Sequence, residues 1–181
     1  MKVKGSLFID FARTIKKDKS GVYDAYLTDT DREIISQRMW PSTWYPFETF
    51  KHCVKAVFEV IAKNDLQVVK EWGRAFFEPI ITTTYMSFLK ERDPFSFIKQ
   101  FETINRSLFN FGKTEIVAEG KNRAVYTLSS FDAKFVPLYY IIQGCIERGL
   151  ELCGAKNIKS EFITKSWEGH PFTSMRFTWK R

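Results

Sequence analysis

The side chains of this sequence that could support catalysis or bind a metal are two histidines, three cysteines and scattered carboxylates. Histidine is the usual base for a serine or cysteine nucleophile, and clustered histidine, cysteine or carboxylate side chains bind zinc. His52 lies opposite the apolar arc of a predicted helix, and His170 lies in a predicted turn beside Pro171. We therefore expect His52 to face solvent, and we expect no catalytic triad and no acid–base pair.

The cysteines do not form a predicted metal site either. Cys145 and Cys153 are eight positions apart on one predicted helix, which separates them by about 12 Å along its axis. Both fall on or near its apolar face, where cysteine behaves as a small hydrophobic side chain. Three cysteines at these spacings are also too few for a disulfide framework. The sequence therefore predicts no bound metal and no other cofactor.

One short segment, Gly112-Lys113-Thr114, matches the last part of a phosphate-binding loop. Ser107 stands where the first glycine of that motif belongs, and a helix is predicted where the motif needs a strand. We interpret the segment as a turn. Because no catalytic motif is found elsewhere, we expect the protein not to be an enzyme.

Hydrophobic periodicity predicts the helices that must position these residues. A capping box at Thr30–Glu33 starts the first of them, and Asp93-Pro94 is a strong start signal for another. Apolar residues recur at helical spacing between and beyond these signals. Helices are expected over about 30–39, 47–63, 66–80 and 94–108.

The pattern changes to short, partly β-branched runs after Gly112. Strands are predicted over 114–118 and 123–129 around a turn at 119–122, and over 158–165 and 172–179, with a helix over 133–153 between the two hairpins. This order predicts one α+β domain spanning 1–181: residues 1–111 are mainly helical, and 112–181 form a hairpin, a long helix and a hairpin. We expect a helical layer packed on an antiparallel sheet of about four strands.

Two glycines interrupt the predicted helix over 133–153, at Gly144 and Gly149. Each costs about 1 kcal/mol relative to alanine in a helix interior. Such a cost indicates close approach of the sheet, of another helix or of a ligand. We favour tight packing of the helix on the sheet.

The formal net charge of +7, from 28 basic and 21 acidic side chains, is concentrated at both ends of the chain. Residues 1–20 and 156–181 each carry six basic and two acidic residues. If the ends lie together they form one positive patch that attracts phosphates or acidic lipids. The alternative, which we favour, is a solvated lysine surface.

No stretch approaches the roughly 20 apolar residues that span a bilayer. Asp10 follows only three apolar residues, so the start does not resemble a signal peptide. We expect a cytoplasmic protein.

Several short motifs resemble those of a bacterial domain family of unknown function that was noticed as paralogues in myxobacteria. The resemblance covers nearly the whole chain and rests on the segments 4–8, 44–46, 71–74, 144–156 and 169–179. That family is distantly similar to 4-vinyl-reductase-type domains and to haem-based nitric-oxide sensor domains. The resemblance implies a helical layer on an antiparallel sheet and a sensory or ligand-binding module.

The sequence departs from those two groups where they bind cofactors. Residues 169–173 read Gly-His-Pro-Phe-Thr, whereas the 4-vinyl-reductase-type domains often carry Gly-Asp-Pro-x-Cys. The haem sensors need an axial histidine and a Tyr-x-Ser-x-Arg motif for the propionates, but Leu128 and Ser130 occupy the serine and arginine positions after Tyr126. We therefore expect neither that metal site nor haem.

The function predicted is a non-enzymatic sensory or small-hydrophobic-ligand-binding domain, in signalling. The aromatic side chains that would line the ligand pocket could instead simply fill the core. The candidate pocket residues are Phe76, Phe77, Phe101, Ile141, Gly144 and Cys145. The alternative is a protein–protein interaction or dimerisation module, with a possible homodimer, through Trp40, Trp44 and Tyr45. A haem-binding gas sensor and a nucleic-acid binder, with bases stacking on Trp167, Phe172 or Trp179, rank below these.

Overall fold

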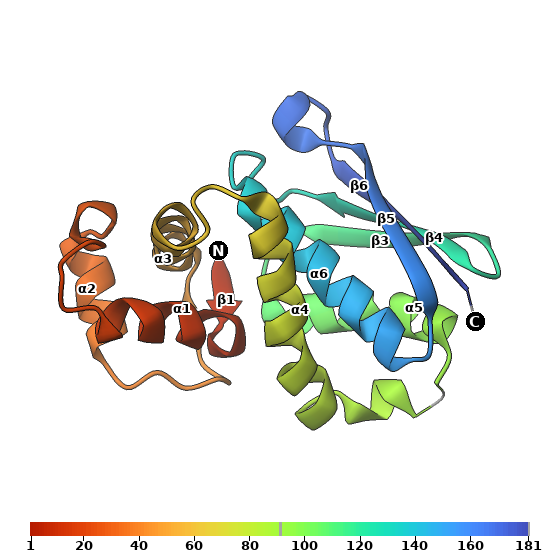
Figure 1. Cartoon of the computed structure of the whole chain (residues 1–181), viewed down its shortest axis with the longest axis horizontal. Coiled ribbons are helices and arrows are strands. Elements are labelled where there is room, and N and C mark those ends of the chain that lie inside the picture. The colour runs from red at the N-terminus through yellow and green to blue at the C-terminus, as the bar shows by residue number, and fades with distance from the viewer. Residues whose placement is uncertain (91, 181) are drawn as a thin grey trace.

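The computed structural model describes residues 1–90 and 92–180. In Figure 1 a first lobe, residues 1–60, lies beside a second lobe that contains the sheet. The elements of the first lobe are β1 (Lys2–Lys4), α1 (Gly5–Lys17), η1 (Asp24–Tyr26), α2 (Asp29–Ser36), β2 (Trp44–Pro46) and α3 (Phe47–Val60). Those of the second are α4 (Leu66–Thr83), η2 (Met86–Leu89), α5 (Pro94–Leu108), β3 (Lys113–Gly120), β4 (Arg123–Ser129), α6 (Val136–Leu152), β5 (Lys156–Thr164), η3 (Ser166–Glu168) and β6 (Thr173–Lys180).

The sheet of the second lobe is antiparallel, with strand order β3-β4-β6-β5. Successive side chains of a strand point to opposite faces of the sheet, and the side chains on its inner face are apolar. Tyr126 and Leu128 of β4 and Met175 and Phe177 of β6 are almost fully buried there. Helices α5 and α6 contact this sheet, and α6 also packs on α4. The predicted α+β class, with helices on an antiparallel sheet of four strands, is confirmed.

The sequence signals for helix ends hold in the second lobe. The Asp93 side chain accepts a hydrogen bond from the Ser96 amide at 2.9 Å, and Pro94 is the first residue of α5. Asp65 caps α4 by accepting from the Gln67 amide at 2.8 Å. These bonds satisfy amide groups that have no partner within the helix.

The capping box of α2 is two residues earlier than predicted. Thr28 accepts from the Asp31 amide, and the Asp31 carboxylate accepts from the Thr28 amide at 2.9 Å. Asp31 completes the capping box with Thr28, and its side chain is buried and also pairs with His52 of α3. The predicted box at Thr30 and Glu33 is therefore wrong.

The first strands join the two lobes and were not predicted from sequence. β1 pairs antiparallel with β2, and Val3 of β1 also forms a bridge with Phe109, just after α5. The Asn110 side chain accepts from the Lys2 amide at 2.6 Å, and the Asn110 amide donates to the Lys2 carbonyl at 3.2 Å. The segment after α5 therefore pairs with the first lobe.

Helices α4 and α6 cross backbone to backbone through two glycines. A Cβ atom on Gly73 would overlap the Ile141 carbonyl, and one on Gly144 would overlap the Lys70 carbonyl. The second glycine of α6, Gly149, leaves room for the ring of Phe97 of α5. The packing of Gly144 and Gly149 on the sheet, which we favoured from sequence, is therefore wrong. Gly144 faces α4, and Gly149 faces α5.

Charged side chains bridge the same two helices beside the glycines. Arg74 of α4 pairs with Glu147 at 3.2 Å and with Glu151 at 2.8 Å, both on α6. Glu147 is buried and also accepts from the hydroxyl of Ser160 on β5, while Lys70 lies 3.4 Å away. A buried carboxylate needs such partners, because leaving it unpaired costs several kcal/mol.

Aromatic rings connect the lobes at two further places. The rings of Phe11 (α1) and Phe76 (α4) are 5.1 Å apart, and that of Phe47 (α3) lies 4.6 Å from that of Phe111. Most of these contacts are edge-to-face, the arrangement that aromatic quadrupoles favour. The buried apolar side chains of both lobes form one cluster.

The two basic ends of the chain do not form one patch. Figure 1 shows the N-terminal segment in the first lobe and the C-terminal strands on the far side of the second lobe. Arg181, which belongs to the basic C-terminal segment, lies outside the described residues. Separately, none of the helices described is both long and apolar enough to cross a membrane.

Substitution of Gly144 tests the helix crossing. We expect Gly144→Ala to lower the unfolding free energy by more than about 2 kcal/mol, although alanine is the better helix former by about 1 kcal/mol. Gly154→Ala is the control, because its surroundings are open and only its positive φ is strained; it should cost about 1 kcal/mol. Urea titration compares the two. Equal losses would contradict the steric role of Gly144.

Candidate functional site

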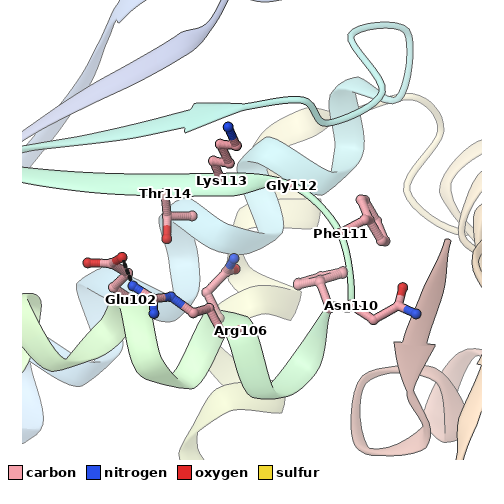
Figure 2. A pocket seen from close by; sticks show the side chains of 9 residues that line it. Glu102, Arg106, Asn110, Phe111, Gly112, Lys113 and Thr114 are labelled. Atoms are coloured by element: carbon pink, nitrogen blue, oxygen red, sulfur yellow. Dashed lines mark hydrogen bonds and ion pairs between the residues drawn. The ribbon is translucent and has the colours of Figure 1, made fainter.

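A groove with a volume of about 510 Å³ lies between the C-terminal half of α5 and the start of β3. We call it the α5–β3 groove, and Figure 2 shows its residues. They are Glu102, Asn105, Arg106, Phe109, Asn110, Phe111, Gly112, Lys113 and Thr114. Its size falls within the range of small-molecule sites, about 300–1,000 Å³.

Helix periodicity and one turn build the groove. Residues three and four apart lie on one face of a helix, so Glu102, Asn105, Arg106 and Phe109 project together from α5 and its end. Gly112 then turns the chain into β3 with φ of +78°, a conformation that glycine adopts without steric cost. The turn predicted over Gly112-Lys113-Thr114 is wrong for its last two residues, because Lys113 and Thr114 begin β3, which returns alongside α5.

Buried polar atoms lie on the inner side of the groove. Asn105 is only 3% exposed, and it lines the groove. The hydroxyl oxygens of Thr114 and Tyr126 are buried and form no hydrogen bond of good geometry, although the two side chains lie close enough for Thr114 to act on the Tyr126 pKa. Tyr126 lies opposite Ile116 and therefore diagonally across from Thr114 on the inner face of the sheet. Each such group costs about 1–3 kcal/mol when left unsatisfied, and such groups are rare in native structures.

Burial keeps the Tyr126 hydroxyl protonated. Desolvation raises its pKa above the usual value and outweighs the hydrogen-bonding effect of the Thr114 side chain, which lowers the pKa; the charge of Glu102 adds a smaller increase. The hydroxyl therefore remains a neutral group that can donate a hydrogen bond. It would serve recognition of an acceptor rather than proton transfer at neutral pH.

The rim of the groove carries charge. Glu102 and Arg106 form an ion pair one helical turn apart. Figure 2 shows the Thr114 side chain pointing from β3 towards this pair, whereas the Lys113 side chain points to the other side of the strand. The inner part of the groove is therefore uncharged and polar, its rim is ionic, and Phe109 and Phe111 form its aromatic part.

The pocket residues predicted from sequence lie largely together, but in the packed interior. The rings of Phe77 and Phe101 are 5.5 Å apart, and Ile141 and Cys145 are buried beside α4 on α6. The Cys145 thiol donates to the Gly73 carbonyl at 3.3 Å. Gly144 faces the backbone of α4. Phe76 is separated from this group, because its ring packs on Phe11 of the first lobe.

The predicted interaction residues surround the start of β2. Trp40 is 50% exposed, and its amide donates to the Tyr45 hydroxyl at 2.8 Å. Trp44 is half-buried under the Lys4 ammonium, which lies 4.2 Å from the ring centroid. These three residues therefore share one surface of the first lobe.

His52 does not face solvent as predicted. It is half-buried, and its Nδ1 atom lies 2.8 Å from the Asp31 carboxylate. Burial opposes ionisation of Asp31, but hydrogen bonds from Thr28, Thr49 and His52 outweigh it and lower the Asp31 pKa. Helical periodicity places His52 correctly on α3, but the periodicity of one helix cannot show that α2 covers this residue. His170 is exposed in the loop before β6.

No protein-family model matches the chain, and no curated protein matches it in sequence. Solved structures do match in shape. An H-NOX protein from S. oneidensis in the Fe(II)NO state gives a TM-score of 0.70 at 14% identity, covering 98% of this chain and 99% of that one. An Fe(II) unliganded H-NOX protein variant from K. algicida gives 0.68 at 15% identity, covering 98% and 97%.

This chain has the H-NOX fold. A third match, an oxygen-binding H-NOX domain related to soluble guanylate cyclases, gives a TM-score of 0.65 at 16% identity and covers 97% of this chain and 92% of that one. The correspondence spans both lobes and the full sheet. It agrees with the fold that the sequence resemblance implied.

The side chains present do not fit the haem that this fold implies. Haem iron takes an axial ligand such as histidine, but His52 is held by Asp31 and His170 lies in an exposed loop. The interior between α4, α5 and the sheet is filled by rings: Phe101 lies 5.5 Å from Phe77 and 5.6 Å from Tyr126. Among the residues described, no group of three or more His, Cys, Asp or Glu side chains could hold a metal ion.

Sequence reasoning did not identify the groove. Gly112-Lys113-Thr114 drew attention to its edge but was interpreted only as a turn. Asn105 was not noted, although it is a polar residue among the apolar positions of α5 and is buried. A buried asparagine on an apolar helix face was the available signal.

A tyrosine-to-phenylalanine pair tests whether the Tyr126 hydroxyl is unsatisfied. Removing it by Tyr126→Phe should leave the unfolding free energy of the ligand-free protein unchanged or raise it by up to about 1 kcal/mol. Tyr139→Phe is the control: the Tyr139 hydroxyl accepts from Ser166 at 3.0 Å, so its loss should cost about 1 kcal/mol. Urea titration measures both. A larger loss in Tyr126→Phe would show that the hydroxyl is already satisfied.

Proposed function

We propose that the protein is a non-enzymatic sensory domain in signalling, which binds a small organic molecule in the α5–β3 groove. The observation that carries this proposal is an open groove lined by Asn105 and by Thr114, whose hydroxyl is buried without a hydrogen bond of good geometry. The Thr114 hydroxyl would gain a hydrogen bond from a bound ligand, and the Asn105 side chain, which also lines the groove, would offer a second. The H-NOX fold supports a sensory role, since its relatives include proteins described with nitric oxide or oxygen bound.

A binding role is favoured over catalysis by the state of the nucleophiles. Burial raises the pKa of the Cys53 thiol to about 12 and that of Cys153 to about 11. It also raises the pKa of Cys145. Only thiolates are effective nucleophiles, so these thiols are unreactive at neutral pH.

The groove indicates the ligand's chemistry. The aromatic side chains of Phe109 and Phe111 suit an apolar body, and the neutral donors Thr114 and Asn105 suit an oxygen-bearing end. This assigns the small hydrophobic ligand expected from sequence to the α5–β3 groove rather than to the packed interior around Phe77 and Phe101.

Two threonine-to-valine variants test the site. In thermal-shift measurements with benzoate, benzamide, benzyl alcohol and their medium-chain aliphatic counterparts, we expect at least one compound to raise the Tm of the wild type by more than about 2 °C. Thr114→Val should abolish the shift, whereas Thr127→Val, on the opposite face of the sheet, should keep it. Native mass spectrometry of protein purified from cells gives a second readout. A native mass equal to that of the polypeptide alone, together with Tm shifts that are absent or unchanged by Thr114→Val, would contradict the proposal.

A haem-binding gas sensor is the second candidate, and the fold likeness favours it. The residues argue against it, because both histidines lie outside the aromatic interior between α4, α5 and the sheet. Haem would therefore require displacement of rings such as Phe101.

Haem titration decides between the two candidates. The purified protein should show no Soret band, and added haemin should give the spectrum of free haemin, identical for the wild type and for His52→Ala. A stoichiometric complex with a sharp Soret band that His52→Ala or His170→Ala abolishes would establish the haem sensor instead.

A further inference from the structure

A second groove, with a volume of about 400 Å³, lies in the first lobe between α1 and the segment that follows α2. Its cationic residues are Arg13, Lys16, Lys17 and Arg38. It contains no acidic lining residue, although Asp10 of α1 lies beside it and pairs with Arg13 at 2.8 Å. We call it the α1 groove.

Two of these cations have hydrogen-bond or ion-pair partners, and the other two have no carboxylate partner. The Lys16 ammonium donates to the Ser36 and Gln37 carbonyls at 3.2 and 3.3 Å, which explains its position at the end of α2. Within residues 1–90 and 92–180, no carboxylate pairs with Lys17 or Arg38. Lys17 also complements the dipole at the C-terminus of α1, but this argument does not extend to Arg38, which is outside any helix.

The floor of the groove is apolar. Ile9 and Met39 are half-buried, and Ala12 is buried. Cations therefore surround a recessed hydrophobic strip. This arrangement suits a partner that brings negative charge together with at least one apolar side chain.

An exposed tryptophan stands at one end of the groove. The Arg38 guanidinium lies 4.1 Å from the ring centroid of Trp40, which is 50% exposed. The backbone of Trp40 is fixed, since its amide donates to Tyr45 and its carbonyl lies against Gly5, where no Cβ would fit. A tryptophan held in this way loses little freedom on binding, and tryptophan is enriched among residues that dominate binding energy.

We propose that the α1 groove, with Trp40, docks an acidic segment of a partner protein that carries an apolar side chain. The occupant follows from the charge and from the recessed floor. A membrane surface would require the apolar residues to project beyond the cations, whereas here they lie below them. Single-stranded nucleic acid binds by stacking bases on open ring faces, and Arg38 and Lys4 each occupy one face of Trp40 and of Trp44, which reduces the faces open to bases.

Fluorescence anisotropy with a labelled synthetic peptide tests the proposal. The probe alternates glutamate and aspartate around a single central leucine, and binding is measured with the full chain at low and at physiological salt. The charge-reversal variant Lys17→Glu/Arg38→Glu should raise Kd at least about tenfold. The matched control Lys156→Glu/Lys159→Glu changes the net charge equally on exposed β5 residues and should change Kd by less than about twofold.

Two further comparisons identify the class of partner. Replacing the central leucine of the peptide by serine should weaken binding to the wild type and leave the charge-reversal variant unaffected. Phosphatidylserine vesicles and an oligothymidylate, tested in the same way, should bind more weakly than the peptide. An equal effect of the two charge reversals, no effect of the leucine, or tighter binding of vesicles or oligonucleotide would each overturn the proposal.

Discussion

The close crossing of α4 and α6 is the contact on which the rest of the molecule depends. The two backbones meet through Gly73 and Gly144, and Arg74 and Glu147 form ion pairs beside them. Helix α6 is anchored to β5 by the Ser160–Glu147 hydrogen bond, and α4 contacts α1 through the Phe11–Phe76 pair. This helix pair therefore links the first lobe to the sheet, together with the bridge between β1 and Phe109. Larger side chains at the glycines would separate the helices and both lobes with them.

The α5–β3 groove lies beside a segment of the chain that contacts both lobes. The residues after α5 pair with β1 and then turn into β3 at Gly112. A groove remains between this segment and α5, and the Thr114 hydroxyl is buried at its edge without a hydrogen bond of good geometry. The site thus follows from the topology rather than from a local motif, which explains why it has no recognisable sequence signature.

Periodicity and caps were sufficient to predict the second lobe. Asp65, Asp93-Pro94 and Gly154 mark helix ends by local hydrogen bonding and backbone conformation, and such signals do not depend on the rest of the fold. Helix α1 was missed because Lys4 provides no side-chain cap, although Leu7, Phe8, Phe11 and Ile15 have helical spacing. The glycines indicated close approach but not the approaching element, and the unsatisfied groups of the groove exist only once distant segments meet. His52 was misplaced for the same reason, because Asp31 reaches it from another helix.

The aromatic contacts between the lobes have a consequence for how the molecule unfolds. Phe47 of the first lobe touches both Phe111 and Phe135, and Phe11 touches Trp72 and Phe76. Neither lobe can melt without exposing rings that belong to the other. The two halves therefore share a single cooperative transition, and partial opening is confined to peripheral loops and chain ends rather than to either half as a whole.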